Sequence, residues 1–297
     1  MILWRRNRGI RDFGGYKLEE VVGGGMYTKI YKAYSALARP IYGHTVAIKI
    51  LYLKEGVRER SKLVAQFERE AEIATEFNHP NIVKVYNFGK YNNQYAIIME
   101  YVPGTNLKEV LYNRDKLPLN VIVKVLYKAG QGLAHIHKHN VVHKDVKPDN
   151  ILVSKDLSIV KITDFGIAKL PGRLWQKDIF PKGGTVTKYG TISYVAPEQK
   201  EGHAMFCSDI YSFGITIDEV LTAKVLVPDN PNKNQEDYFK RIDLRSYRKN
   251  MGRQEVLCEN LSIPGGLKEI IKKATKYEPA IRYQNMDELL MELKNFL

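Results

Sequence analysis

The most informative part of this sequence is His143-Lys144-Asp145-Val146-Lys147-Pro148-Asp149-Asn150. It concentrates two carboxylates, two lysines and a side-chain amide in eight consecutive positions. Asp164-Phe165-Gly166 and Ala196-Pro197-Glu198 follow it in the chain. Each motif alone supports only a general hypothesis about chemistry, whereas their shared order and spacing are far more specific.

Two further motifs lie upstream, where the chain is predicted to form strands. Val46-Ala47-Ile48-Lys49 places a lysine on a predicted strand, and Glu70 lies on the helix predicted after it, at a position where a carboxylate can pair with the ammonium. Gly23-Gly24-Gly25 lies between two predicted strands, where glycines let backbone amides approach a phosphate chain. Taken singly, these features also fit a tight hairpin, a surface lysine and a solvated glutamate.

In sequence order, the motifs V-A-I-K, H-x-D-x-K-P-x-N, D-F-G and A-P-E resemble those of the eukaryotic-like (Hanks-type) serine/threonine protein kinases. The resemblance covers residues 16–297, and Tyr194–Gln199 and Ser208–Gly214 are similar to bacterial members of that family. It implies an α+β, bilobal protein-kinase-like fold. Residues 16–101 would form a small antiparallel β lobe with one helix and residues 102–297 a larger, mainly helical lobe, with ATP in the cleft between them.

The resemblance also implies roles for the polar residues of the larger lobe. Asp145 would accept or orient the proton of the substrate hydroxyl, and Lys147 would neutralise charge on the γ-phosphoryl group. Asn150 and Asp164 would supply hard oxygen ligands to Mg²⁺, with Mn²⁺ as a possible substitute. This set predicts transfer of the γ-phosphate of ATP to Ser or Thr hydroxyls of protein substrates, and autophosphorylation is expected as well.

In the smaller lobe, the resemblance assigns phosphate binding to Lys49 and to the glycines. Lys49 would hold the α and β phosphates and Glu70 would anchor Lys49, so that moving the helix of Glu70 away would lower activity. Gly23, Gly24 and Gly25 would lie against the nucleotide. Thr28 replaces the third glycine of the family's loop, from which we expect more restrained loop motion without loss of binding.

A site for the nucleotide base is implied in the same way. Ile30, Ala47 and Leu152 would form its apolar walls. The Glu100 carbonyl and the Val102 backbone would hydrogen-bond adenine.

Other positions match supporting residues of the family. Met99 would limit the depth of the base pocket, or simply pack in the core. Glu198 has a candidate partner in Arg282, and Asp209 would hold the catalytic loop. Lys147-Pro148 and Gly190-Thr191 are similar to serine/threonine rather than tyrosine kinases.

The position before Asp145 departs from the family's pattern. Lys144 stands where most regulated members carry an arginine, and a lysine is a point charge that cannot hold a phosphate in bidentate fashion. We therefore expect phosphorylation to be less necessary for activity, with Thr185 and Thr187 as candidate autophosphorylation sites.

Periodicity and chain-breaking residues predict the remaining elements. The predicted strands are residues 16–22, 29–34, 45–51, 82–88 and 95–101, and the predicted helices are residues 61–77, 107–112, 119–139, 208–222, 267–276 and 286–296. Residues 170–194 and 226–262 are predicted to be rich in loops.

Composition limits the class of protein less sharply. The 297 residues include 46 Lys and Arg against 33 Asp and Glu, a formal net charge of +13 that is dispersed along the chain. Cys207 and Cys258 have neither disulfide nor zinc-site spacing, which predicts a reducing, cytoplasmic location. No apolar run is long enough to span a membrane, and the basic stretch 1–15 is read as a tail without a signal peptide or an assigned function.

Two other classes of function remain as alternatives. A nucleotide-binding scaffold without turnover, that is a pseudokinase, is disfavoured by the intact Asp145, Asn150 and Asp164. A basic nucleic-acid-binding module would need clustered Lys and Arg interleaved with exposed aromatic residues, so no specific nucleic acid partner is expected.

Overall fold

The computed structural model describes residues 13–53, 57, 60–91, 93–113, 117–164, 194–200, 202–225 and 263–297. It forms two compact units, Met1–His79 with Val83–Pro103, and Pro80–Ile82 with Gly104–Leu297. Several sequence predictions fall outside the described residues: those on Phe165-Gly166, Thr185, Thr187, Gly190-Thr191, Cys258, residues 226–262, most of residues 170–194 and most of the basic tail.

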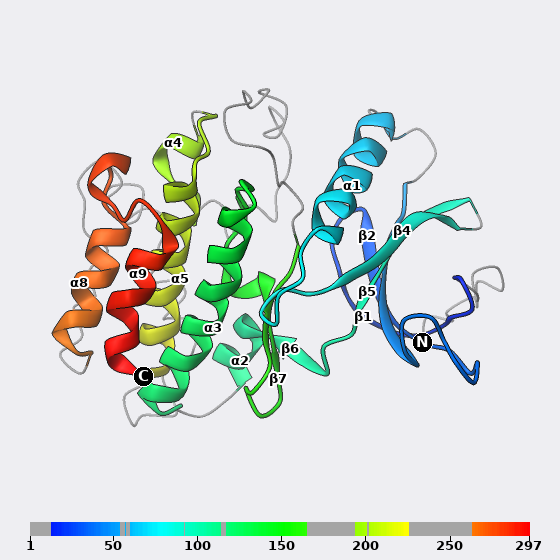
Figure 1. The fold of residues 1–297 in the computed structure, drawn as a ribbon, viewed down its shortest axis with the longest axis horizontal. Helices are drawn as coiled ribbons and strands as arrows, with labels where there is room; N and C mark the ends of the chain where they lie inside the picture. Colours follow the sequence, from blue (N-terminus) through cyan, green and yellow to red (C-terminus); the bar gives the residue numbers. More distant parts are fainter. Residues whose placement is uncertain are drawn as a thin grey trace, which may run out of the picture. The chain divides into compact units, whose positions relative to one another are not determined.

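The first unit is an antiparallel sheet with one helix (Figure 1). Its strands are β1 (Lys17–Gly24), β2 (Thr28–Tyr34), β3 (Thr45–Leu51), β4 (Val85–Tyr91) and β5 (Gln94–Glu100), in the order β1-β2-β3-β5-β4. Helix α1 (Arg60–Thr75) packs against β4 and buries an apolar stripe of Phe67, Ala71, Ile73 and Ala74. The central strand β3 is buried at every position after Thr45, which explains its nearly continuous apolar sequence.

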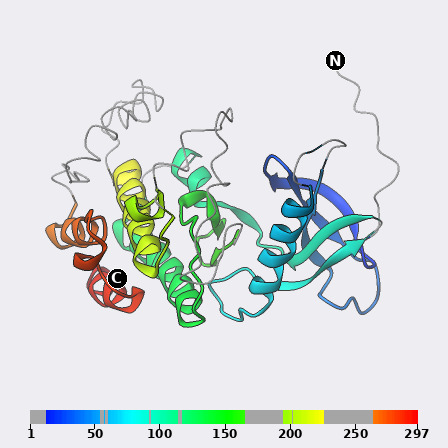
Figure 2. The ribbon, with the colours of Figure 1, turned by 90° about the horizontal axis from the view of Figure 1, so that it is seen from above.

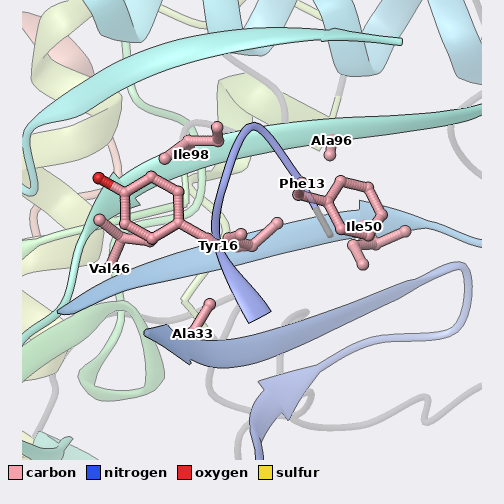
Figure 3. Packing of buried hydrophobic residues seen from close by; sticks show 8 residues of the cluster. Phe13, Tyr16, Ala33, Val46, Ile50, Ala96 and Ile98 are labelled. Carbon is pink, nitrogen blue, oxygen red and sulfur yellow. The ribbon is translucent and has the colours of Figure 1, made fainter. Parts of the chain in front are cut away.

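Apolar side chains from three strands form a core on one face of this sheet. Phe13 and Tyr16, which precede β1, pack on Ala33 of β2, on Val46, Ile48 and Ile50 of β3, and on Ala96 and Ile98 of β5. Figure 3 shows the two rings lying across these strands.

The second unit is mainly helical. Its helices are α2 (Leu107–Asn113), α3 (Leu119–Lys138), α4 (Pro197–Lys200), α5 (Phe206–Val225), α8 (Gly265–Ala274) and α9 (Met286–Leu293), with 3-10 turns η1 (Pro148–Asn150), η4 (Pro279–Ile281) and η5 (Lys294–Phe296). Helix α3 packs against α5 and α9, and α5 packs against α8; Figures 1 and 2 show these four helices side by side. The stripe predicted on α3 is buried at Val123, Leu126 and Leu133.

A small sheet accompanies these helices. Strands β6 (Gly104–Asn106), β7 (Ile151–Ser154) and β8 (Val160–Ile162) pair antiparallel in that order. Strands of three or four residues are too short to show alternation, and the sequence therefore did not predict them. The sheet matters for the site because β7 follows His143–Asn150 directly and β8 ends just before Asp164.

The predicted α+β fold, with an antiparallel sheet and one helix in one part and mainly helices in the other, is confirmed. Several predicted boundaries differ from the observed ones by two or three residues. The strand predicted from residue 82 begins at Val85, because Ile82 instead forms an isolated bridge with Ile162 in the second unit. The helix predicted to residue 77 ends at Thr75. Within the described part of the chain, no helix combines the length and the apolar composition that crossing a bilayer requires.

Candidate functional site

The carboxylate of Asp145 is held by two neighbouring side chains. Lys147 Nζ donates to Asp145 Oδ1 at 2.9 Å and to Oδ2 at 2.7 Å. Asn150 Nδ2 donates to Asp145 Oδ2 at 2.8 Å and to the Asp145 carbonyl at 2.7 Å. The three bonds to its oxygens fix the orientation of the carboxylate, although the Asp145 side chain keeps 18% of its surface exposed. A fixed, negatively charged and accessible oxygen is suited to accept a proton from a hydroxyl group.

The backbone before Asp145 is fixed from helix α5. Asp209 is fully buried, and its two carboxylate oxygens accept hydrogen bonds from the amides of His143 and Lys144, each at 2.7 Å. His137 Nε2 lies 2.9 Å from the same carboxylate. Since hydrogen bonds to a carboxylate contribute about 1.5–3 kcal/mol each, this buried charge is well compensated. Asp209 therefore holds the loop as predicted.

Two residues that the sequence reading did not single out complete this support. His143 Nδ1 accepts from the Asp145 amide at 3.3 Å, so its proton lies on Nε2, which is 3.1 Å from the Thr163 carbonyl. Gln199 Nε2 donates to the Lys144 carbonyl at 2.8 Å. Their signal in the sequence was their place inside the motifs H-x-D and A-P-E-Q, which names the positions but not their partners.

Asn150 and Asp164 supply the oxygen atoms expected of a magnesium site. Asn150 makes its side-chain hydrogen bonds to Asp145 through Nδ2, so Oδ1 is the side-chain atom that could bind a metal ion. The Asn150 carbonyl accepts from the amide of Thr163, the residue before Asp164, at 3.0 Å, so the two predicted ligands lie on neighbouring backbone segments. Amide and carboxylate oxygens are ligands that fit Mg²⁺. No group of three or more His, Cys, Asp or Glu side chains suited to a metal occurs among the residues that the structure describes.

In the first unit, Lys49 and Glu70 form an ion pair. Lys49 Nζ on β3 lies 2.8 Å from Glu70 Oε1 on α1, and the two side chains are only 10% and 11% exposed. The pair links the sheet to its one helix, so a shift of α1 would move or break it.

The glycine segment closes the turn between β1 and β2. Gly23 is paired with Ile30 and Gly24 with Lys29, and the Gly25 amide donates to the Thr28 carbonyl at 2.9 Å. Gly24 has φ +148°, and a Cβ there would lie 2.5 Å from the Thr28 carbonyl oxygen. A side chain at residue 24 is therefore excluded by the turn itself, whatever binds there.

The predicted base-binding residues fall in both units. In the first unit, Ala47 is paired with Met99 and both are buried, while Ile30 is paired with Lys49. Glu100 ends β5, where its amide donates to the Lys84 carbonyl at 2.8 Å, and Val102 is buried just after it. Leu152 lies on β7 in the second unit, paired with Asn106 and Lys161.

The predicted partnership of Glu198 and Arg282 forms as a bidentate, buried ion pair. The guanidinium donates to Glu198 Oε1 at 2.7 Å and to Oε2 at 2.9 Å. It also donates to the carbonyls of Lys276, Cys207 and Tyr277. Ser208 Oγ donates to Glu198 Oε1 at 2.6 Å, so both charged groups are extensively hydrogen-bonded.

The free energy of unfolding should depend on pH through the Glu198–Arg282 ion pair. Burial raises the pKa of Glu198, but hydrogen bonds from Arg282 and Ser208 outweigh burial and hold the pKa below the ordinary value of a glutamate. A lowered folded-state pKa gives stability that is present above the unfolded value and lost as pH falls through the folded value. The gap in unfolding free energy between wild type and Glu198→Gln should therefore narrow in urea titrations as the pH falls below the ordinary range of a glutamate pKa.

A second carboxylate with a lowered pKa also affects stability at acidic pH, and it must be separated from the effect of Glu198. Hydrogen bonds from Ser154 and Ser158 lower the pKa of Asp156 to about 2. Asp156 is present in both proteins, so its contribution cancels in the difference. A gap that stays constant over the whole range would contradict the role given to Glu198.

A charged cluster beside the catalytic loop was missed by the sequence reading. Lys108 Nζ on α2 lies 3.3 Å from Glu219 Oε1 on α5 and 3.9 Å from Asp149 Oδ2 in η1. The Tyr194 hydroxyl donates to the other oxygen of Glu219. No motif spacing relates these four residues, because they come from four separate segments.

Comparison with known proteins gives a consistent family match. The family model described as protein kinase domain matches residues 16–292. A probable serine/threonine-protein kinase of Clostridium acetobutylicum is 36% identical over 281 residues, which cover 94% of this chain and 39% of the relative. Serine/threonine-protein kinase PrkC of Bacillus subtilis is 31% identical over 287 residues, 96% of this chain and 41% of the relative.

A third similar protein is serine/threonine-protein kinase PknB of Mycolicibacterium smegmatis, which is 29% identical over 289 residues, 94% of this chain and 42% of the relative. The chain thus spans about two fifths of the length of the curated relatives it matches.

Proposed function

Because this chain belongs to the protein kinase domain family, we propose that it transfers the γ-phosphate of ATP to Ser and Thr hydroxyls of protein substrates, itself included. The observation that carries the proposal is the Asp145 carboxylate, held between Lys147 and Asn150 on a loop fixed by Asp209. Phosphoryl transfer needs little covalent assistance and depends mainly on positioning and charge neutralisation, which this arrangement supplies.

The transfer step requires a hydroxyl oxygen to attack the γ-phosphorus while the bond to the β-γ bridging oxygen breaks. Asp145 accepts the hydroxyl proton and ADP leaves with the electron pair of the broken bond. Lys147, whose ammonium already lies 2.7 Å from Asp145, neutralises charge on the transferred group. Lys49 holds the α and β phosphates, oriented by its ion pair with Glu70.

Nucleotide binding is assigned to residues of both units. The amides of Gly23, Gly24 and Gly25 line the phosphates, with no side chain at residue 24 to obstruct them. The apolar walls for adenine are Ile30, Ala47 and Leu152, with Met99 limiting the depth and the Glu100 and Val102 backbone pairing with the base. Asn150 and Asp164 hold Mg²⁺ or Mn²⁺, which neutralises phosphate charge when bound.

Ser and Thr are the proposed acceptors because Lys147 and Pro148 follow Asp145 in the pattern of the serine/threonine class. The names of the relatives in Clostridium, Bacillus and Mycolicibacterium support the same acceptors. The two lobes proposed for the catalytic domain are residues 16–101 and 102–297. The cytoplasm is the proposed location, supported by two cysteines without disulfide spacing, and nucleic acid is not a proposed partner.

Transfer of radiolabel tests the function directly. The full chain is incubated with γ-labelled ATP and Mg²⁺, alone and with a generic basic acceptor protein, and labelled residues are identified after acid hydrolysis. Label on phosphoserine or phosphothreonine supports the proposal. Absence of label, together with Mg²⁺-dependent ATP binding in a thermal shift, would replace it with a nucleotide-binding scaffold.

The Lys49–Glu70 pair gives a matched test on one helix. Glu70→Gln should raise KM for ATP about tenfold, because Lys49 loses the charge that orients it toward the phosphates. Glu72→Gln removes a carboxylate from the same helix, where it pairs with Arg69 at more than half exposure, and should leave KM unchanged. Equal KM values for the two variants would contradict the role of Glu70.

A further inference from the structure

A two-residue turn precedes the first strand of the sheet. The Phe13 amide donates to the Tyr16 carbonyl at 3.0 Å, and the Tyr16 amide donates to the Phe13 carbonyl at 3.3 Å. Between them, Gly14 and Gly15 have φ values of +63° and +88°. Two successive left-handed residues fit a tight primed turn, which glycine adopts without strain. The sequence Phe-Gly-Gly-Tyr thus forms a tight turn closed by two backbone hydrogen bonds.

The turn brings two aromatic rings onto the sheet. Phe13 is fully buried and Tyr16 is 2% exposed, and both pack on the core described above (Figure 3). The Phe13 ring also lies 5.9 Å from the ring of Tyr91 on β4. Removing two large aromatic rings from water is strongly favourable, so this packing attaches the turn firmly to the sheet.

The hydroxyl of Tyr16 fixes the chain that leads into β3. It donates to the Gly43 carbonyl at 2.9 Å and accepts from the Tyr42 amide at 3.1 Å. The Tyr42 ring in turn stacks on Tyr86 of β4, with centroids 5.1 Å apart and planes 1° from parallel. The start of β3, at Thr45, is therefore held close to the turn.

Strand β3 connects the turn with Lys49. Successive side chains of a strand point to opposite faces. Val46, Ile48 and Ile50 pack with Phe13 and Tyr16, so Lys49 lies on the opposite face, where it pairs with Glu70. The two rings are the packing support behind the strand segment that carries Lys49.

We propose that Phe13 and Tyr16 are positioning residues for Lys49 and thereby set the affinity of the protein for ATP. The proposal rests on the phosphate-binding role given to Lys49 above. The kinase family match begins at residue 16, so Phe13 and both turn glycines lie before the matched region. This chain therefore carries a determinant of nucleotide affinity outside the part that the family model matches.

The test compares truncations of buried side chains in the two units of the full chain. Phe13→Ala should weaken Mg·ATP binding and raise KM for ATP about fivefold with kcat within about twofold, because Lys49 binds ground and transition states alike. Phe13→Leu keeps the position apolar and should restore most of the affinity. Tyr16→Phe keeps the ring but loses both hydroxyl bonds, and should raise KM about two- to threefold.

Leu289→Ala is the matched control. Leu289 is fully buried in α9 of the second unit and lies outside the proposed machinery, so its truncation lowers stability without affecting Lys49. If Phe13→Ala and Leu289→Ala have the same KM and the same Kd for Mg·ATP, the proposal is wrong. Binding of Mg·ATP is measured by titration calorimetry, which does not depend on turnover. If the wild type binds Mg·ATP but transfers no label, that result counts against the proposed function and not against the role of Phe13 and Tyr16.

Discussion

The Asp145→Asn variant is expected to bind Mg·ATP as tightly as the wild type and to transfer phosphate about 10²–10⁴-fold more slowly. Asparagine keeps the shape of the side chain and an oxygen that accepts from Lys147 and Asn150, which now hold the carboxylate at 2.7 and 2.8 Å. It removes the negative charge and the basic oxygen that receives the hydroxyl proton. The loss therefore falls on kcat, because the nucleotide contacts remain.

Single-turnover transfer from γ-labelled ATP, together with a binding titration, measures both quantities. Asp156→Asn is the control, since Asp156 is a carboxylate of the same unit that accepts hydrogen bonds from Ser154 and Ser158, and its variant should transfer at the wild-type rate. Transfer by Asp145→Asn within about threefold of the wild type would exclude Asp145 as the proton acceptor.

The largest expected loss of stability comes from breaking the Glu198–Arg282 pair. Arg282→Met should lower the free energy of unfolding by about 3–5 kcal/mol, because a buried carboxylate is left without its cationic partner. The Arg282 side chain is 0% exposed and also donates to three carbonyls, which lose their partner in the variant. Urea unfolding followed by circular dichroism measures the change.

Two further variants show whether the loss of stability in Arg282→Met comes from breaking the buried ion pair or simply from removing a positive charge. Lys138→Met removes the lysine of an ion pair with Asp287 whose side chains are 64% and 58% exposed, and it should cost less than about 1 kcal/mol. The double variant Glu198→Gln/Arg282→Met should lose less than the sum of its single variants, since no buried charge is left uncompensated. Additive losses would show that the pair is not coupled.

The strands of the first unit could be predicted because short runs of apolar and β-branched residues, bounded by glycines and polar turns, mark them well. Residues 29–34 and 45–51 were predicted to be strands and lie within β2 and β3. The family predicted from four motifs is confirmed by the match over residues 16–292. Strands β6 to β8 were missed because a pairing of three or four residues is fixed by its neighbours and not by its own periodicity.

The residues of the candidate site also differ in how far the sequence alone could identify them. The motifs named Lys49, Asp145, Asn150 and Asp164, because the proposed chemistry requires a particular functional group at each of these positions. They did not name Lys108 or Phe13, because those residues matter through contacts with distant segments. A role that depends on which elements meet in space has no local signature, whereas a role that depends on a functional group does.

The eight residues from His143 to Asn150 do not determine their own backbone conformation. Lys144 has φ +72°, a left-handed conformation that costs a non-glycine residue about 1–3 kcal/mol. Asp209, 65 residues further along the chain, offsets that cost by accepting hydrogen bonds from the amides of His143 and Lys144. A short peptide with this sequence, or the same eight residues grafted onto an unrelated loop, would lack Asp209. Lys144 would then return to a negative φ and the loop would lose its conformation, because helix α5 holds that conformation in place.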